Sequence, residues 1–404
     1  MKKIRNISDK KVRNILLVLV ILSGYGFSCI YWQGKVLQYV NYLVGIIIFL
    51  TCFRQKNKVE THPINGLVLC LMIYPILSFV LSSYLFNPTA WGYYKYRIFA
   101  QLYFCIFFIF SIYRISERAI VKSFVFIGII VLFIQIIQQL FPDSAIFGIR
   151  DVNSPMSDGF DKVEIRNGLY RYRLMSVYFI TMLCVFYYWQ RLLVKRTRKD
   201  IFMFLAFLVS IYLFLTRQIM FSVGMTLLLS FVFTNNKRMK WWAVIISVVI
   251  SIILYFSFDL IFGELMGKTS EEMDESNIRL VCFDFYWEKI MSSPVTALFG
   301  NGFSSHLLSW QEDLRLTPAD IGMIGEAYYY GFIWMVIYFY TLYLVLVKYR
   351  AKIPLYIKQF YFSTFLISVM VFPYRSAIEN LIWGAILYIS CQYIKSNYTY
   401  KPLK

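Results

Sequence analysis

Residues 200–235 read DIFMFLAFLVSIYLFLTRQIMFSVGMTLLLSFVFTN, an apolar run that only the triplet Thr216-Arg217-Gln218 interrupts. As one helix the run would be about 51 Å long at ~1.5 Å per residue, too long for a hydrocarbon core of roughly 30 Å. Two helices of about 16 residues would each be ~24 Å long. The run therefore predicts a short membrane hairpin, with Arg217 at a tip that stops below the outer surface.

The composition places the whole chain in a membrane. Its mean hydropathy is +0.60, and 16% of its 404 residues are charged, against roughly 25% in soluble domains. No polar block is long enough to form a separate soluble domain, so we expect one all-α, polytopic domain over residues 1–404. The apolar runs predict about twelve spans, at 15–32, 36–53, 66–86, 98–113, 123–141, 174–190, 201–216, 218–234, 242–262, 322–347, 357–372 and 380–394.

The charges are unevenly distributed over the segments between these spans. With the N-terminus inside, the inner segments hold about two thirds of the 41 basic residues and only four acidic ones. This is the positive-inside pattern, so both termini are predicted to be cytoplasmic. The net charge of +19 then reflects topology and contact with anionic lipid, and it does not indicate a nucleic-acid partner. Two larger loops are predicted outside, 142–173 and 263–321, the second lying between the ninth and tenth spans.

Several kinds of chemistry have no support in the sequence. There is no phosphate-binding loop, no dinucleotide fingerprint and no nucleophile elbow. The seven cysteines are scattered without metal-ligand spacing, and His62 and His306 are predicted on opposite sides of the membrane. We therefore expect no metal and no cofactor. A reaction on the outer side would need a substrate that arrives already activated, because nucleotides are absent there. The alternative is transport.

Two arginines are the first candidates for an outer functional site. Arg217 would lie in or near hydrocarbon, which is costly unless the side chain faces a cavity or a partner; alternatively, it reaches the outer headgroups. Arg279 belongs to one stripe of a predicted amphipathic helix in the membrane interface, or is a solvated charge on a surface helix. The other members of that stripe are Phe283, Tyr286 and Ile290.

Two features should end this amphipathic helix. Pro294 is expected to stop it, and a tight Gly300-Asn301-Gly302 turn follows.

Three further groups could act as a general base. His306 is the only predicted outer side chain with an ordinary pKa near neutrality, although a lone loop histidine often has no role. Asp320 lies where a span begins, which suits a helix N-cap equally well. Glu326 lies inside the same span and should face a polar cavity.

Other outer side chains could bind a substrate. Arginine binds phosphate through a planar fork of donors, so these residues would fit a membrane-anchored diphosphate. Arg375 could also pair with Glu379 one helical turn away. The candidates for substrate binding are Arg97, Arg166, Arg171, Arg173, Arg375 and Trp287.

The order of these features resembles the O-antigen and capsule polymerase family (Wzy-type), which is related to the O-antigen ligases. The hairpin with Arg217 is followed by NIRL, Trp287, Pro294 and Gly-Asn-Gly, and then by ADIGMIGEAYYYGF. As topology the resemblance covers most of the chain, whereas its motifs cover about 60 residues. Ligases usually carry a histidine where this chain has Asp320, which favours a polymerase.

The resemblance implies a metal-independent glycosyltransferase of GT-C-like fold in the bacterial cytoplasmic membrane. The enzyme would act on the outer face, on sugars carried by undecaprenyl diphosphate, with a flippase and a chain-length regulator as possible partners. An acceptor hydroxyl would attack the anomeric carbon while the lipid diphosphate leaves. Arg217 and Arg279 would stabilise the leaving diphosphate, and His306, Asp320 or Glu326 would take the proton.

Other functions stay open at this point. A ligase and a rod-shape-type glycan polymerase are the nearest enzymatic alternatives. A twelve-helix flippase or transporter is the alternative from another class. It is disfavoured because residues 1–200 and 201–404 show no clear similarity and the longest loop is predicted outside, away from the midpoint of the chain.

Overall fold

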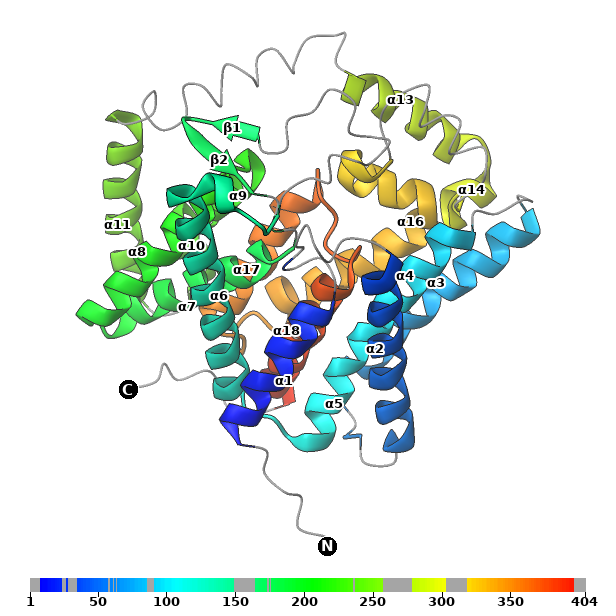
Figure 1. Cartoon of the computed structure of the whole chain (residues 1–404), viewed down its shortest axis with the longest axis horizontal. Coiled ribbons are helices and arrows are strands. Elements are labelled where there is room, and N and C mark those ends of the chain that lie inside the picture. Colours follow the sequence, from blue (N-terminus) through cyan, green and yellow to red (C-terminus); the bar gives the residue numbers. More distant parts are fainter. Residues whose placement is uncertain are drawn as a thin grey trace, which may run out of the picture.

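A computed structural model shows a mostly helical chain (Figure 1). It describes residues 8–23, 27, 35–56, 59–60, 62, 64–85, 91–148, 164–172, 174, 176–234, 237–256, 278–302 and 318–395. Up to residue 171 the elements are α1 (Asp9–Leu22), α2 (Lys35–Arg54), α3 (Asn65–Leu85), α4 (Trp91–Gln101), η2 (Leu102–Cys105), α5 (Ile106–Tyr113), α6 (Glu117–Leu140), η3 (Pro142–Ser144), β1 (Glu164–Arg166) and β2 (Leu169–Arg171).

The remaining elements are also helical. They are α7 (Tyr178–Val194), α8 (Arg198–Leu213), α9 (Arg217–Leu228), α10 (Ser230–Phe233), α11 (Lys237–Phe256), α13 (Ile278–Met291), α14 (Pro294–Phe299), η4 (Pro318–Ile321), α16 (Gly322–Tyr343), the π-helical turn η5 (Leu344–Lys348), α17 (Leu355–Ser368) and α18 (Ala377–Lys395).

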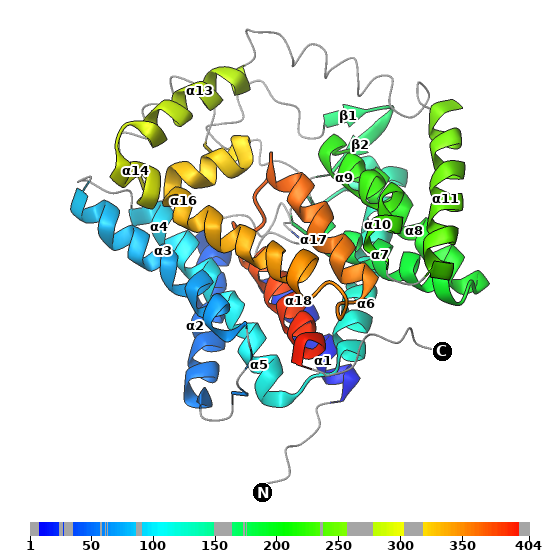
Figure 2. The ribbon, with the colours of Figure 1, turned by 180° about the vertical axis from the view of Figure 1, so that it is seen from behind.

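Helix α18 lies at the centre of the bundle (Figures 1 and 2). Its residues from Ala377 to Cys391 are all buried. It packs against α4, η2 and α5, and also against α1 and α7. The two ends of α18 therefore serve as reference positions for describing where the buried polar groups lie.

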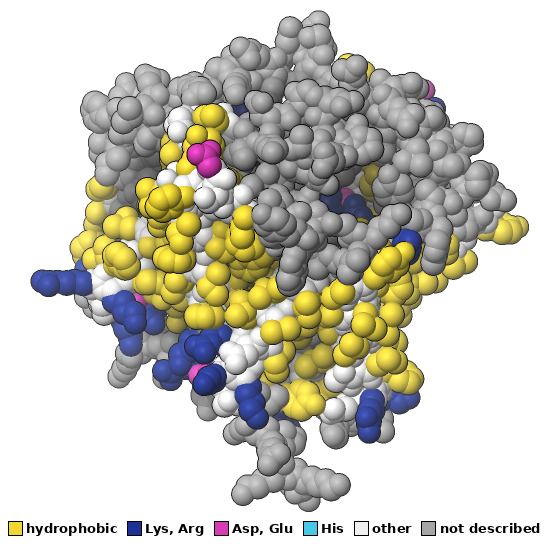
Figure 3. All heavy atoms as spheres, in the orientation of Figure 1, with side chains coloured by type: hydrophobic (Ala, Val, Ile, Leu, Met, Phe, Trp, Pro, Cys, Tyr) yellow, Lys and Arg dark blue, Asp and Glu magenta, His cyan; other side chains and the backbone are white. Residues whose placement is uncertain are grey.

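Within the described part of the chain, four helical stretches are long and apolar enough to cross a membrane: Asn65–Ser82, Lys95–Tyr113, Glu117–Leu140 and Gly322–Lys348. Shorter apolar helices accompany them, so the chain is an all-α protein of the membrane-embedded type. Figure 3 shows hydrophobic side chains in a broad band, with Lys and Arg gathered at the edge where α1 begins. This arrangement agrees with the charge asymmetry, while the number of spans and their orientation stay predictions.

The predicted break in the 200–235 run is confirmed. Helix α8 ends at Leu213 and α9 begins at Arg217, with Leu215 between them in the left-handed region at φ 49°. A difference appears further on, because the span predicted at 218–234 is divided at Leu229 into α9 and the short α10. The hairpin is thus even shorter than its apolar length suggests.

The helix predicted around Arg279 is present as α13, but one expectation about it is wrong. Pro294 does not end α13; it begins α14, where Ser293 and Thr296 form a capping box and proline needs no N–H donor. Of the predicted stripe, Tyr286 and Ile290 are buried, whereas Phe283 is 41% exposed. The buried stripe continues through Cys282 instead, and the Tyr286 ring packs 4.9 Å from that of Tyr328 on α16.

Helix α16 is interrupted at Gly331, whose φ of 75° and ψ of 177° are not helical. The interruption frees backbone carbonyls that lipid could not satisfy. Asn301 N–H donates to the Tyr328 carbonyl at 2.7 Å, and Gly302 N–H donates to the Tyr329 carbonyl at 3.1 Å. The Tyr74 hydroxyl donates to the next carbonyl, that of Tyr330. The predicted Gly-Asn-Gly turn therefore exists, and it supplies donors to the broken helix.

Replacement of Gly331 by alanine should unfold this junction. A Cβ there would lie 2.1 Å from the Leu298 carbonyl oxygen in a left-handed backbone, a cost of about 3 kcal/mol or more. Gly224→Ala is the matched control, because a Cβ on that helical glycine meets nothing within 4 Å. The measurement is the apparent melting temperature in detergent. Equal melting temperatures for both variants would contradict the proposed packing.

Candidate functional site

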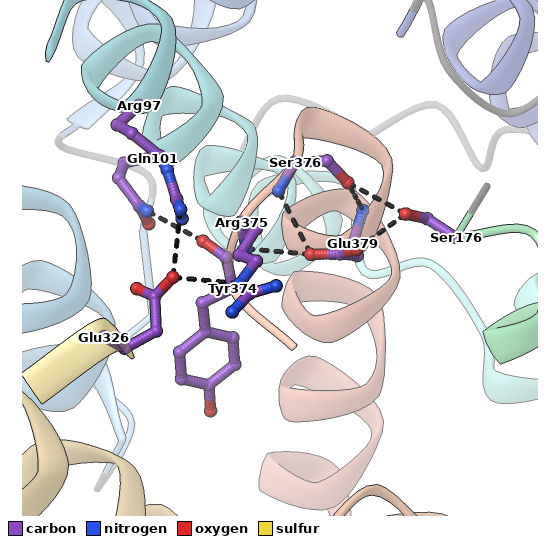
Figure 4. Close-up of polar contacts among 8 residues, drawn as sticks. All are labelled: Arg97, Gln101, Ser176, Glu326, Tyr374, Arg375, Ser376 and Glu379. Carbon is purple, nitrogen blue, oxygen red and sulfur yellow. Dashed lines mark hydrogen bonds and ion pairs between the residues drawn. The ribbon is translucent and has the colours of Figure 1, made fainter. Parts of the chain in front are cut away.

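A buried cluster of one carboxylate and two guanidinium groups lies between α4, α16 and the start of α18 (Figure 4). Arg97 Nη2 and Arg375 Nε are each 2.9 Å from the same oxygen, Glu326 Oε1. Glu326 is 0% exposed and Arg97 is 7% exposed. Buried charges are costly in an apolar bundle unless they are paired, so this ion cluster demands an explanation.

The ion cluster is not internally satisfied. Within the described part of the chain, Glu326 Oε2, Arg97 Nη1 and Arg375 Nη2 are shielded from solvent and have no hydrogen-bond partner. Two arginines share this one glutamate as their direct ion-pair partner, and a second buried carboxylate, Glu379, acts on Arg375 through space. The unmet guanidinium donors suit an anion that would bind beside Glu326.

The backbone around the ion cluster is held by side chains. Gln101 Nε2 donates to the Tyr374 carbonyl at 3.1 Å. Asn380 Nδ2 donates to the Ala100 carbonyl at 2.9 Å. These two bonds join α4 to the segment that carries Arg375. Consequently Arg97 and Arg375 are positioned by packed backbone, and their mutual distance does not depend on Glu326 alone.

A second carboxylate, Glu379, anchors the backbone of Arg375. Its Oε2 accepts the N–H groups of Arg375 and Ser376 at 2.8 and 3.1 Å, and its Oε1 accepts the Ser176 hydroxyl at 2.6 Å. Ser376 Oγ in return accepts the Glu379 N–H at 3.3 Å, so the pair forms a capping box for α18. The expected side-chain pair between Arg375 and Glu379 is wrong, because the guanidinium of Arg375 binds Glu326.

A second group of arginines lies at the α8–α9 tip. The two-stranded sheet pairs Glu164 with Arg171 and Arg166 with Leu169. Arg166 Nη1 donates to the Leu215 carbonyl at 3.2 Å, and Arg171 Nη2 lies 3.4 Å from Thr216 Oγ1. Three predicted arginines, Arg166, Arg171 and Arg217, therefore meet at this tip, which we call the arginine tip.

The arginine tip and the ion cluster lie close along the chain. Arg171 ends β2, and five residues later Ser176 binds Glu379. A fully extended segment of that length spans at most ~18 Å. The two groups of arginines can therefore face one extended, anionic substrate.

The other predicted site residues fall into two classes. Trp287 is 40% exposed on α13, where it stacks on Phe283, and it contributes nothing to the ion cluster. Arg279 and Asp320 lie in α13 and η4, with side chains outside the described part. His306 and Arg173 lie outside the described residues altogether.

Sequence reasoning missed the residues that support the arginines. Ser376 and Glu379 carry the S-x-x-E spacing of a capping box, which is a readable signal. Gln101 is a polar residue inside a predicted span, which also could have been noticed. The Ser176 contact joins residues more than 200 positions apart, and no local pattern indicates it.

A polar cavity of about 470 Å³ lies at the opposite end of α18. Glu60 binds Arg114 and Lys395 there, both at 2.7 Å, and these three side chains are substantially exposed. The hydrogen bond from Lys395, together with the charge of Arg114, holds the pKa of Glu60 below its ordinary value. Both oxygens of this carboxylate are paired, and the one buried polar atom of the lining that lacks a partner among the described residues is Nδ1 of His62, whereas the ion cluster has unmet donors on two guanidinium groups. We therefore take the ion cluster as the candidate site.

No protein-family model matches the chain, and no curated protein matches it in sequence. The candidate site is thus argued from its geometry. Among the described residues, no group of three His, Cys, Asp or Glu side chains is placed to hold a metal ion.

His62, which lines this cavity, leads to a prediction about how the stability of the protein depends on pH. Burial, and then the charge of Lys395, lower the pKa of His62 below its ordinary value of 6.5. As the pH falls through about 6.5, the unfolded chain takes up a proton before the folded chain does, so stability present above that pH is lost. We expect the apparent melting temperature in detergent to fall between pH 7.5 and about 5.5, and to fall less in His62→Gln.

His306→Gln is the control, since the chain has two histidines. If the wild type and His62→Gln lost the same number of degrees over this range, the lowered pKa of His62 would have no part in stability.

Proposed function

We propose that the chain is a polysaccharide polymerase that joins oligosaccharide units carried on undecaprenyl diphosphate. It would act at the outer face of the bacterial cytoplasmic membrane, as in O-antigen or capsule synthesis. The observation that carries the proposal is the ion cluster, in which Arg97 and Arg375 converge on Glu326 Oε1 and each keeps a guanidinium donor without a partner among the described residues.

The chemistry of such a reaction requires an anion-binding site of this kind. A hydroxyl of the acceptor sugar attacks the anomeric carbon, and the bond between that carbon and the lipid diphosphate breaks. The diphosphate leaves with the bonding electrons, so charge develops on its oxygen atoms. Preorganised arginines in a dry site stabilise that charge and orient the leaving group, because guanidinium forks match phosphate geometry.

The arginine tip supplies a second contact for the same substrate. Arg217, Arg166 and Arg171 surround a hairpin too short to reach the predicted outer surface. A lipid-linked diphosphate has its polar group at such a depth while its tail stays in hydrocarbon. His306 and Asp320 are retained as candidates for the base that accepts the hydroxyl proton.

Elongation of a lipid-linked unit is the direct test. Membranes that contain the protein should convert a lipid-linked oligosaccharide into a ladder of longer products, without nucleotide sugar and without divalent metal. The ladder is read by gel electrophoresis of the released glycans. Movement of the lipid-linked unit across the membrane without elongation would indicate a flippase, and transfer of a preformed glycan to lipid A would indicate a ligase. Either result would overturn the proposal that the protein is a polymerase.

Loss of the arginines should stop elongation. Arg97→Gln, Arg375→Gln and Arg217→Ala should each lower the elongation rate roughly 10²-fold or more, the usual cost of removing a donor to a developing anion. Arg114→Gln is the matched control, because this arginine pairs with Glu60 at the other end of α18 and is exposed. The rate is measured at equal protein levels. Full activity in a variant would remove that arginine from the site.

A further inference from the structure

The role of Glu326 follows from how the two arginines bind it. Arg97 and Arg375 both donate to Oε1, and neither uses the paired donors of its fork on the two carboxylate oxygens. The other oxygen, Oε2, accepts no hydrogen bond within the described part of the chain. Glu326 therefore holds the arginines through a single shared oxygen, and donors on both guanidinium groups stay available.

The charges argue that the ion cluster is built for a further anion. One arginine would neutralise Glu326, and no further described carboxylate makes an ion pair with the second arginine. The buried Glu379 lies near enough to act on Arg375 electrostatically, but its oxygens accept the N–H groups of Arg375 and Ser376 and the Ser176 hydroxyl. Arg97 is 7% exposed, so bulk water does not relieve the charge of its guanidinium. A structural ion pair would need only two partners. The presence of a second arginine is explained if a phosphate oxygen of a ligand can replace Glu326 Oε1 as the partner of the arginines.

The surrounding contacts leave the guanidinium of Arg375 free to change partner. Glu379 binds the backbone N–H of Arg375, and Gln101 binds the carbonyl of the preceding residue, Tyr374. Both bonds persist whichever anion the guanidinium contacts. The side chain can therefore turn from Glu326 to a ligand without any loss of the backbone contacts that hold α18 and α4 together.

We infer that Glu326 is a resident counter-ion, which occupies the place of a phosphate oxygen until the diphosphate of the substrate competes for Arg97 and Arg375. This inference rests on the proposed function for the identity of the ligand. When no ligand is bound, the negative charge of Glu326 offsets the repulsion between the guanidinium groups of Arg97 and Arg375. In the occupied site it opposes the bound diphosphate, so it weakens binding and speeds release of the product. Glu326 is thus a positioning residue, and its role as a general base is not required.

Binding of inorganic pyrophosphate to the purified protein tests this role. Glu326→Gln preserves the size of the side chain and one acceptor oxygen but removes the competing charge. We expect isothermal titration calorimetry in detergent to give at least tenfold tighter binding than in the wild type. Glu60→Gln is the matched control, because that carboxylate also binds two basic side chains, at the far end of α18. It should leave the affinity unchanged.

Unchanged or weaker binding by a folded Glu326→Gln protein would overturn the inference, and so would an equal gain in Glu60→Gln. If the glutamine variant does not fold, Glu326→Asn decides the matter. It removes the same charge in a shorter side chain, so affinity should again rise, and an unchanged affinity would count against the inference.

The binding assay is independent of the polymerase reaction. If the wild type failed to elongate lipid-linked units but Glu326→Gln bound pyrophosphate more tightly, the proposed function would be refuted. The inference that Glu326 is a resident counter-ion would stand. A protein that elongated lipid-linked units, with no gain in binding for the variant, would refute the counter-ion alone.

Discussion

The pairing of Glu326 with Arg97 and Arg375 is the contact on which the arrangement around the site depends. Charges inside an apolar bundle must find partners, because lipid offers neither water nor counter-ions. Here the partners come from α16, from α4 and from the segment before α18, so three parts of the chain meet at one carboxylate oxygen. The rest of the local structure follows from keeping these parts in register, through Gln101, Asn380 and the capping box of Glu379.

Irregular backbone collects around this meeting point for the same physical reason. Non-helical backbone at membrane depth survives only where protein groups satisfy its N–H and C=O groups. The interruption of α16 at Gly331 is satisfied by the Gly300-Asn301-Gly302 turn and by Tyr74. At the arginine tip, the Leu215 carbonyl is satisfied by Arg166. Each break in a helix thus gives a polar side chain a place to enter the bundle, which a membrane protein with uninterrupted helices would lack.

Local sequence patterns anticipate part of this structure. Helix length against hydrocarbon thickness correctly places the break at Arg217, and glycine spacing correctly places the 300–302 turn. Burial of Glu326 follows from its position inside an apolar span. Local patterns do not indicate which charged side chains form ion pairs with each other. Arg375 lies one turn from Glu379 and 49 positions from Glu326, yet it binds the distant carboxylate, because the near one caps α18. The proline of α14 was misread for a related reason, since proline suits a helix start as well as a helix end.

The two guanidinium groups of the ion cluster bear on the proposed turnover as well as on binding. Two arginines without Glu326 would hold a diphosphate strongly in a dry site, where charge–charge interactions are weakly screened. Such binding lowers the energy of the bound product as much as that of the transition state, and only interactions stronger in the transition state accelerate the chemical step. A carboxylate that shares one oxygen between both arginines reduces ground-state binding while it leaves the guanidinium donors in position. Under the proposed function, this geometry suits a site that releases a lipid diphosphate in every cycle.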